Sequence, residues 1–210
     1  MRGLLRELGI VVPVGAAELT RRFSEWLEDD AIPPSLIDSL RIVADEIRAL
    51  ETCIADVERR LAEATRHDPA VQSVRQISGI GLLGSTALVA SAVDPRNFKN
   101  GRHLASWLGP TPREHSSGQR RVLGGISKRG DVYTRMLLIH GARSVLLRAA
   151  QLKRSGHPLN GLQRWALGLK DRAGHNKAAV GLANKLARIA WACWKDGTMF
   201  DPEQAVAQPA

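Results

Sequence analysis

The sequence predicts an all-α protein in which a long, coiled-coil-like helix precedes a compact helical domain. Three observations predict this class. Apolar residues follow a heptad pattern over residues 35–65, a glycine-centred pattern near residue 80 is typical of two helices joined by a hairpin turn, and no segment alternates as a strand would. We expect a helical hairpin or coiled coil over residues 1–68, a compact domain over 69–197, and a flexible tail over 198–210.

The charge is unevenly distributed along the 210 residues. The net charge is +9 overall, but it is −5 over residues 1–95, +13 over 96–172 and +1 over 173–210. A block of one sign favours a polyanionic partner, with nucleic acid ahead of an anionic membrane. A solvated basic face without a function is the alternative.

Other function classes are disfavoured by composition. The two cysteines are far apart and the six histidines lack metal-ligand spacing, so we expect neither a disulfide framework nor a metal site in this chain. The uncharged stretch 77–93 has 17 residues, which is short for a membrane span of about 20. We therefore expect a cytoplasmic, nucleoid-associated protein with no membrane partner.

Two helices are expected in the first part of the chain. Residues 16–30 predict a short amphipathic helix that Pro33 and Pro34 end. Over 35–65 the apolar spacing alternates between four and three, which is typical of a coiled coil about 46 Å long. The apolar positions are Leu36, Leu40, Val43, Ile47, Leu50, Ile54, Val57, Leu61 and Ala64. This stripe either packs on 16–30 or pairs with a second copy. We favour a homo-oligomer through 35–65, since 16–30 is too short to cover it.

Residues 69–93 predict a helix–hairpin–helix unit. Gly79 and Gly81 would permit positive φ and close backbone approach, and free N–H groups at the start of a helix from Leu82 would hold a phosphate. The same pattern fits a tight turn between two packed helices. The neighbouring basic block favours contact with nucleic acid, so we include both glycines in the candidate interface.

The segment 109–130 is the centre of the functional prediction. Asn100 caps a short helix over 101–108, and the glycine-rich loop that follows is too long for an ordinary connection. Its composition predicts a loop that grips phosphates. Its basic residues are Arg113, Arg120, Arg121, Lys128 and Arg129. Further helices are expected over about 131–153, around Trp165 and over 176–194. Arg135 is expected on an outer face and is added to the interface.

A serine hydroxyl within such a loop can attack a DNA phosphodiester. Transesterification onto the side chain conserves the phosphoester bond, and nearby cations stabilise the charge of the transition state. Ser116 and Ser117 precede Gly118 in this loop. Taken alone, Ser-Ser-Gly is also an ordinary turn sequence.

Four motifs together resemble a known family. The runs GIG, SWLGPTPREHSSG, GGISKRGD and NKAAVGLANKLARIAW are similar to the C-terminal domain of the DEDD-type insertion-sequence transposases, the "IS one-ten" family. These enzymes are related to the pilin-inverting recombinase and are guided by a bridge RNA. The resemblance covers about residues 69–195, and the heptad region resembles the family's coiled coil.

The resemblance implies a DNA transposase or site-specific recombinase with a serine nucleophile. By motif position the nucleophile is Ser117, with Ser116 as runner-up, and Ser127 fits less well. DNA and a guide RNA are the implied partners. Arg120, Arg121, Lys128 and Arg129 would clamp phosphates.

The family's active site is composite, and its other half is an N-terminal RuvC-like domain with four metal-binding acidic residues. That domain is not recognisable here, and Asp94, Glu114 and Asp131 are too few to replace it. We therefore expect a truncated transposase that is inactive alone. A misplaced start codon, or an acidic domain on another polypeptide, is the alternative. No cofactor is expected in this chain, and Mg²⁺ only with the acidic domain.

Two other function classes remain open at this point. One is a non-catalytic helical module that binds nucleic acid and dimerises, and the other is a helical interaction protein with an incidental basic face. Salt-sensitive binding to DNA or RNA would separate the first from the second.

Overall fold

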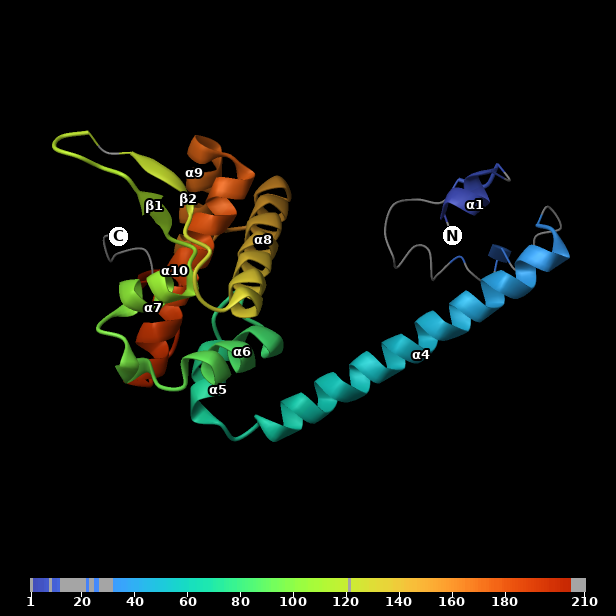
Figure 1. The fold of residues 1–210 in the computed structure, drawn as a ribbon, viewed down its shortest axis with the longest axis horizontal. Helices are drawn as coiled ribbons and strands as arrows, with labels where there is room; N and C mark the ends of the chain where they lie inside the picture. The colour runs from blue at the N-terminus through green and yellow to red at the C-terminus, as the bar shows by residue number, and fades with distance from the viewer. Residues whose placement is uncertain are drawn as a thin grey trace. The chain divides into compact units, whose positions relative to one another are not determined.

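The computed structural model describes residues 2–7, 9–11, 22, 25–26, 32–120 and 122–204, and these are mostly helical (Figure 1). The predicted all-α class is confirmed, with a single two-stranded sheet among the described residues. The chain divides into two compact units, Met1–Leu61 and Ala62–Ala210. No helix in the described ranges has the length and apolar character needed to cross a membrane.

The first unit contains α1 (Arg2–Glu7) and most of α4 (Pro34–Ala64), which Figure 1 shows as a long continuous rod. Proline suits the first position of α4 because that N–H has no intrahelical partner. A small core covers only the beginning of the rod. Its buried members are Leu5, Trp26, Ile32, Leu40 and Ala44.

Farther along α4 the heptad stripe is uncovered. Leu50, Ile54 and Val57 are 56%, 58% and 63% exposed. The small core thus covers the stripe at the beginning of α4, and the stripe is open to solvent at Leu50, Ile54 and Val57. We call these three residues the exposed stripe. The helix predicted over 16–30 falls almost entirely outside the described residues, and self-association through 35–65 stays a prediction.

The second unit is a bundle around α10 (His175–Asp196). This helix packs against α5 (Pro69–Arg75), α7 (Gly101–Leu108), α8 (Val132–Arg154) and α9 (Gly161–Ala173). Alanines dominate its buried face and let neighbouring helices approach closely. The buried residues of α10 are Ala178, Ala179, Leu182, Ala183, Leu186, Ala187, Ala190 and Cys193.

Polar residues before the helices of this unit fix where they begin. Asn100 accepts the N–H of His103 at the start of α7, as predicted, and Asn160 forms a capping box with Gln163 at the start of α9. Residues 198–204 are held against the bundle. Phe200 donates its N–H to Gln76 on the α5 side, and residues 205–210 lie outside the described ranges.

The two predicted hairpin glycines differ. They lie between α5 and α6 (Leu82–Ala92), which a short 3₁₀ turn, η1 (Pro95–Asn97), follows. Gly79 has φ +93, and its carbonyl oxygen would be 1.8 Å from a Cβ placed on Gly141 of α8. Gly81 has φ −82 and open space around it, so the expectation of positive φ is confirmed for Gly79 and wrong for Gly81.

The basic segment is a β-hairpin that projects from the helices (Figure 1). β1 (Pro112–Glu114) pairs antiparallel with β2 (Leu123–Ile126). The expectation that the chain has no strand is therefore wrong. Neither strand buries a face, and β2 contains two glycines, so the sequence shows neither the alternation nor the composition typical of a strand.

Candidate nucleic-acid interface

The tip of the hairpin is a two-residue turn. Ser117 and Arg120 exchange both backbone hydrogen bonds, at 3.2 and 3.1 Å, and Gly118 between them has φ +57. A glycine with positive φ at the first central position is typical of a type II′ hairpin turn, whose twist matches that of the flanking strands. The turn sets Ser117 directly opposite Arg120.

The two candidate nucleophiles differ in what their hydroxyls contact. Ser116 Oγ donates to Glu114 Oε1 at 2.7 Å and accepts the Val122 N–H at 3.1 Å. Ser117 is exposed, and its hydroxyl has no hydrogen-bond partner within the described part of the chain. The free hydroxyl is therefore that of Ser117, whereas the hydroxyl of Ser116 braces the hairpin.

The base of the hairpin is fixed between α7 and α8. Ser127 N–H donates to Thr111 O at 2.8 Å, and Lys128 N–H donates to Gly109 O at 3.2 Å. Lys128 has φ +57, which is uncommon for a residue with a side chain. A Cβ on Gly130 would be 1.9 Å from the carbonyl oxygen of Trp107. This closeness leaves no space for any other residue at position 130.

Arg135 is part of this base and not of the surface. It is 7% exposed, and its Nη1 donates to Leu108 O at 3.0 Å and to Arg129 O at 2.7 Å. The prediction that Arg135 lies on an outer face is wrong. Because two carbonyls at the hairpin base need a donor, the guanidinium is turned inward, where it ties the end of α7 to the segment before α8.

A cavity of about 490 Å³ lies beside the hairpin base. It brings together the predicted clamp residue Arg129 and a second basic residue of the predicted interface, Arg113, whose Nη2 lies 3.4 Å from the carbonyl oxygen of Ser127. Three hydroxyl residues share the lining, which are Ser106, Thr111 and Ser127. Guanidinium groups next to hydroxyls are typical contacts for phosphate oxygens. Sequence reasoning missed Ser106 and Thr111 as site residues, although both lie within the SWLGPTPREHSSG motif.

The basic residues of the predicted interface therefore fall into two groups. Arg120 lies at the tip with Ser117, whereas Arg113 and Arg129 lie at the base. Ser117 is four residues from Arg113, or about 13 Å along an extended strand. The two groups can thus contact different phosphates of one strand. Lys128 is exposed near the base, and Arg121 lies outside the described residues.

The carboxylates near the basic block do not assemble a metal site. Asp94 binds Arg96, and Glu114 accepts the Ser116 hydroxyl. Asp131 caps α8 through the Thr134 N–H, and this hydrogen bond lowers the pKa of that carboxyl. No group of three histidine, cysteine or acidic residues in the described ranges could hold a metal ion. The residues present do not fit the Mg²⁺ site of the resemblance, so no step of the proposed reaction is assigned to it.

Of the two glycines of the α5–α6 turn, only Gly79 has a packing role. Gly79 is in close contact with α8, and a Cβ there would be 2.8 Å from Val145 Cγ2. Gly81 is exposed at the start of α6, where the helix has no side-chain cap. Of the two residues, Gly81 is the one that a ligand can reach.

Comparison with known proteins finds similarity to transposases. Residues 71–157 match the model of a family described as "Transposase IS116/IS110/IS902 family". A Pseudomonas aeruginosa protein named "Probable family 20 transposase" is 40% identical over 96% of this chain and 59% of its own length. The transposase for insertion sequence element IS1111A of Coxiella burnetii is 38% identical over 91% of this chain and 52% of its own. That for IS1328 of Yersinia enterocolitica is 34% identical over 95% and 58%.

These relatives share the whole region that holds the hairpin and the helical bundle. The chain spans between half and three-fifths of the length of these three relatives. The matched family model covers the α5–α6 unit, α7, the hairpin and α8. Over residues 71–157 the chain is therefore similar to the IS116/IS110/IS902 family of transposases.

Proposed function

We propose that this chain acts in DNA transposition, with the β-hairpin gripping a DNA strand and Ser117 attacking one of its phosphodiesters. The observation that carries the proposal is the exposed hydroxyl of Ser117 at the tip of a cationic hairpin, opposite Arg120, with no hydrogen-bond partner among the residues that the structure describes. The fixed base of the hairpin supports it, because a nucleophile needs a defined position relative to the phosphate.

The proposed step is a transesterification. The Ser117 Oγ forms a bond to phosphorus, the bond from that phosphorus to one bridging oxygen of the strand breaks, and the hydroxyl proton ends on the leaving oxygen. One phosphoester bond replaces another, so the break can be rejoined without an external energy source. Arg120 would offset the negative charge that develops on the phosphoryl oxygens.

The test uses a covalent-adduct assay. The chain is joined to the remaining part of a relative's transposase and incubated with labelled DNA carrying the ends of that element, and adducts are counted after denaturation. Ser117→Ala should abolish adducts and leave DNA affinity within about twofold, because the hydroxyl makes no structural contact. Ser116→Ala is the matched control and should retain adducts. Adducts that persist in Ser117→Ala would refute the assignment, and their loss in Ser116→Ala alone would transfer the role to Ser116.

A second candidate function is a non-catalytic module that binds nucleic acid. The lack of a carboxylate cluster among the described residues favours it for this chain by itself. It requires salt-sensitive binding with little sequence preference. Full adduct formation by the joined protein that is lost in Ser117→Ala would exclude it.

We also propose that the exposed stripe of α4 pairs with the same stripe of a second copy. Its apolar residues remain in the heptad register after the small core ends, and the Arg48–Asp45 ion pair lies on the opposite, polar side of the helix. Ile54→Lys should shift the chain to a monomer in sedimentation velocity. Arg48→Ala, on the polar side, should not. A wild-type chain that is monomeric at high micromolar concentration would contradict the pairing.

A guide RNA is proposed as a further partner from the family resemblance. The cationic hairpin contacts backbone phosphates, which both nucleic acids carry, so affinity for RNA should fall with salt as it does for DNA. An RNA of the mobile element that does not compete with DNA, and does not bind by itself, would contradict this partner.

A further inference from the structure

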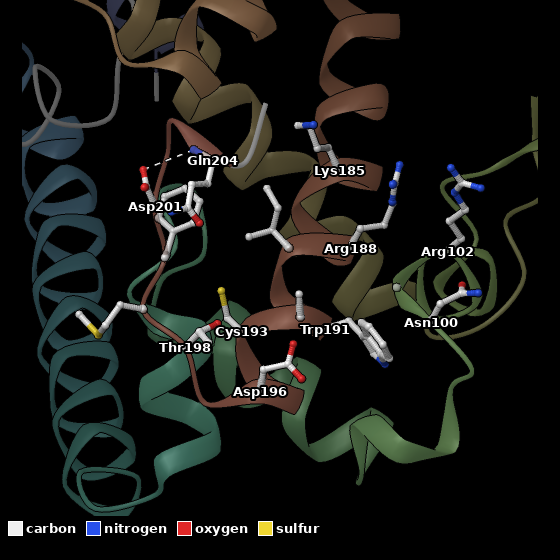
Figure 2. A pocket seen from close by; sticks show the side chains of 15 residues that line it. Asn100, Arg102, Lys185, Arg188, Trp191, Cys193, Asp196, Thr198, Asp201 and Gln204 are labelled. Atoms are coloured by element: carbon white, nitrogen blue, oxygen red, sulfur yellow. Dashed lines mark hydrogen bonds between the residues drawn. The ribbon is translucent and has the colours of Figure 1, made fainter. Parts of the chain in front are cut away.

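A second cationic pocket lies on the bundle, between the start of α7 and α10. Its volume is about 450 Å³, within the range of small-ligand pockets. Three basic side chains line it, which are Arg102, Lys185 and Arg188. In Figure 2 they lie in a row along one edge, and the guanidinium groups of Arg102 and Arg188 point to the same side.

Backbone packing holds these residues together. A Cβ on Gly101 would be 3.0 Å from both the Cα and the carbonyl oxygen of Arg188, so the first turn of α7 lies directly on α10. Lys185 and Arg188 are three residues apart and share one face of the helix. The Nζ of Lys185 lies 4.9 Å from the centre of the Trp165 ring, and this cation–π contact restricts the side chain.

No carboxylate in the described ranges neutralises this cluster. None of the three cations forms an ion pair with a described residue. Burial lowers the pKa of Lys185, and the nearby Arg188 lowers it further. Burial lowers the pKa of Arg188 as well, with Arg102 adding to the effect. Arg102 also occupies the first turn of α7, where the helix dipole disfavours a cation.

The two acidic residues that line the pocket lie apart from the three basic ones. Figure 2 shows Asp196 and Asp201 away from the row of cations. Asp201 Oδ1 accepts the N–H groups of Glu203 at 2.8 Å and Gln204 at 3.4 Å, so it caps the turn after α10. The cationic edge thus carries an excess of positive charge that an anion would relieve.

We infer that Arg102, Lys185 and Arg188 bind a backbone phosphate of a nucleic-acid strand, at a site separate from the β-hairpin. Holding three positive charges together in a partly buried place costs free energy of folding, and a bound anion would offset that cost. The inference rests on the proposed function only in taking nucleic acid as the source of that phosphate. It places a second point of contact on α7 and α10, so a strand can be held at two places.

The test measures fluorescence anisotropy of a short random DNA duplex and of a single-stranded RNA with the full chain. Arg102→Gln and Arg188→Gln should each weaken binding about threefold to tenfold at physiological salt and reduce the salt slope by about one. Arg96→Gln is the matched control. Arg96 is exposed and already paired with Asp94, so its loss should change affinity by less than about twofold.

A second readout separates a ligand site from a structural role. Because Arg188→Gln removes a like charge, it should keep or raise the Tm while it weakens nucleic-acid binding. Arg188→Lys retains the charge and should recover much of the affinity. Arg102 is exposed, so we expect Arg102→Gln to fold normally. A wild-type affinity and salt slope in this variant would overturn the inference.

Two further arms distinguish the possible failures. Millimolar inorganic phosphate that stabilises the wild type but not Arg102→Gln, with unchanged nucleic-acid affinity, would indicate a small-anion site and overturn the inference. A double hairpin variant, Arg113→Gln with Arg120→Gln, tests the proposed function separately. If the hairpin variant binds weakly while Arg102→Gln and Arg188→Gln bind normally, only the pocket inference fails. If the hairpin variant binds normally while Arg102→Gln and Arg188→Gln bind weakly, only the hairpin proposal fails.

Discussion

Replacement of Arg135 by methionine tests whether the hairpin base depends on one buried guanidinium. Its Nη1 donates to the carbonyl oxygens of Leu108 and Arg129, and the residue is 7% exposed. Hydrogen bonds from charged donors are worth about 1.5–3 kcal/mol each, and the methionine would leave two carbonyls at the base without this donor. Methionine fills much of the space of the arginine stem, which reduces the loss.

We expect Arg135→Met to lower the free energy of unfolding by about 2–4 kcal/mol, a large part of the 5–15 kcal/mol of a typical domain. Urea denaturation followed by circular dichroism measures it. Arg148→Met makes the same chemical change on the exposed side of α8 and should cost less than about 0.5 kcal/mol. If the two variants unfold at the same urea concentration, the buried hydrogen bonds do not stabilise the hairpin base.

Three further predictions concern the backbone and the pH dependence. Gly130→Ala should prevent the hairpin base from forming, since its Cβ would be 1.9 Å from a carbonyl oxygen of α7, and Tm should fall sharply. Gly79→Ala should destabilise the bundle while Gly81→Ala is tolerated, because only the first has positive φ and a filled Cβ position; equal Tm values would contradict this. The hydrogen bonds that Asp131 accepts at the start of α8 lower its pKa below the usual 3.8. The ionised Asp131 cap therefore stabilises the fold fully above about pH 3.8, and this stabilisation is lost as the pH falls through the lowered pKa. Asp131→Asn should reduce stability at neutral pH and flatten its decline below about pH 4, measured by urea titration.

Local signals in the sequence predicted most of the helices. The heptad spacing predicted a helix over 35–65 and the structure has it over Pro34–Ala64. The predicted cap Asn100 and the predicted range 101–108 match α7 as observed. Caps, prolines and apolar periodicity act within a few residues, so they can be interpreted without the fold. The charge block and the motif around Ser117 also predicted a contact with nucleic acid, which stays a prediction.

The tertiary structure decided the hairpin and the location of its charges. The strands of residues 112–126 bury no face, so no pattern of apolar residues marks them. Arg135 turns inward because a carbonyl oxygen 27 residues earlier in the chain comes within 3.0 Å of its guanidinium. Arg102 and Arg188 form one pocket only because a glycine lets α7 rest on α10. Contacts between distant residues determine which charges are free to bind, and the order of residues along the chain does not specify those contacts directly.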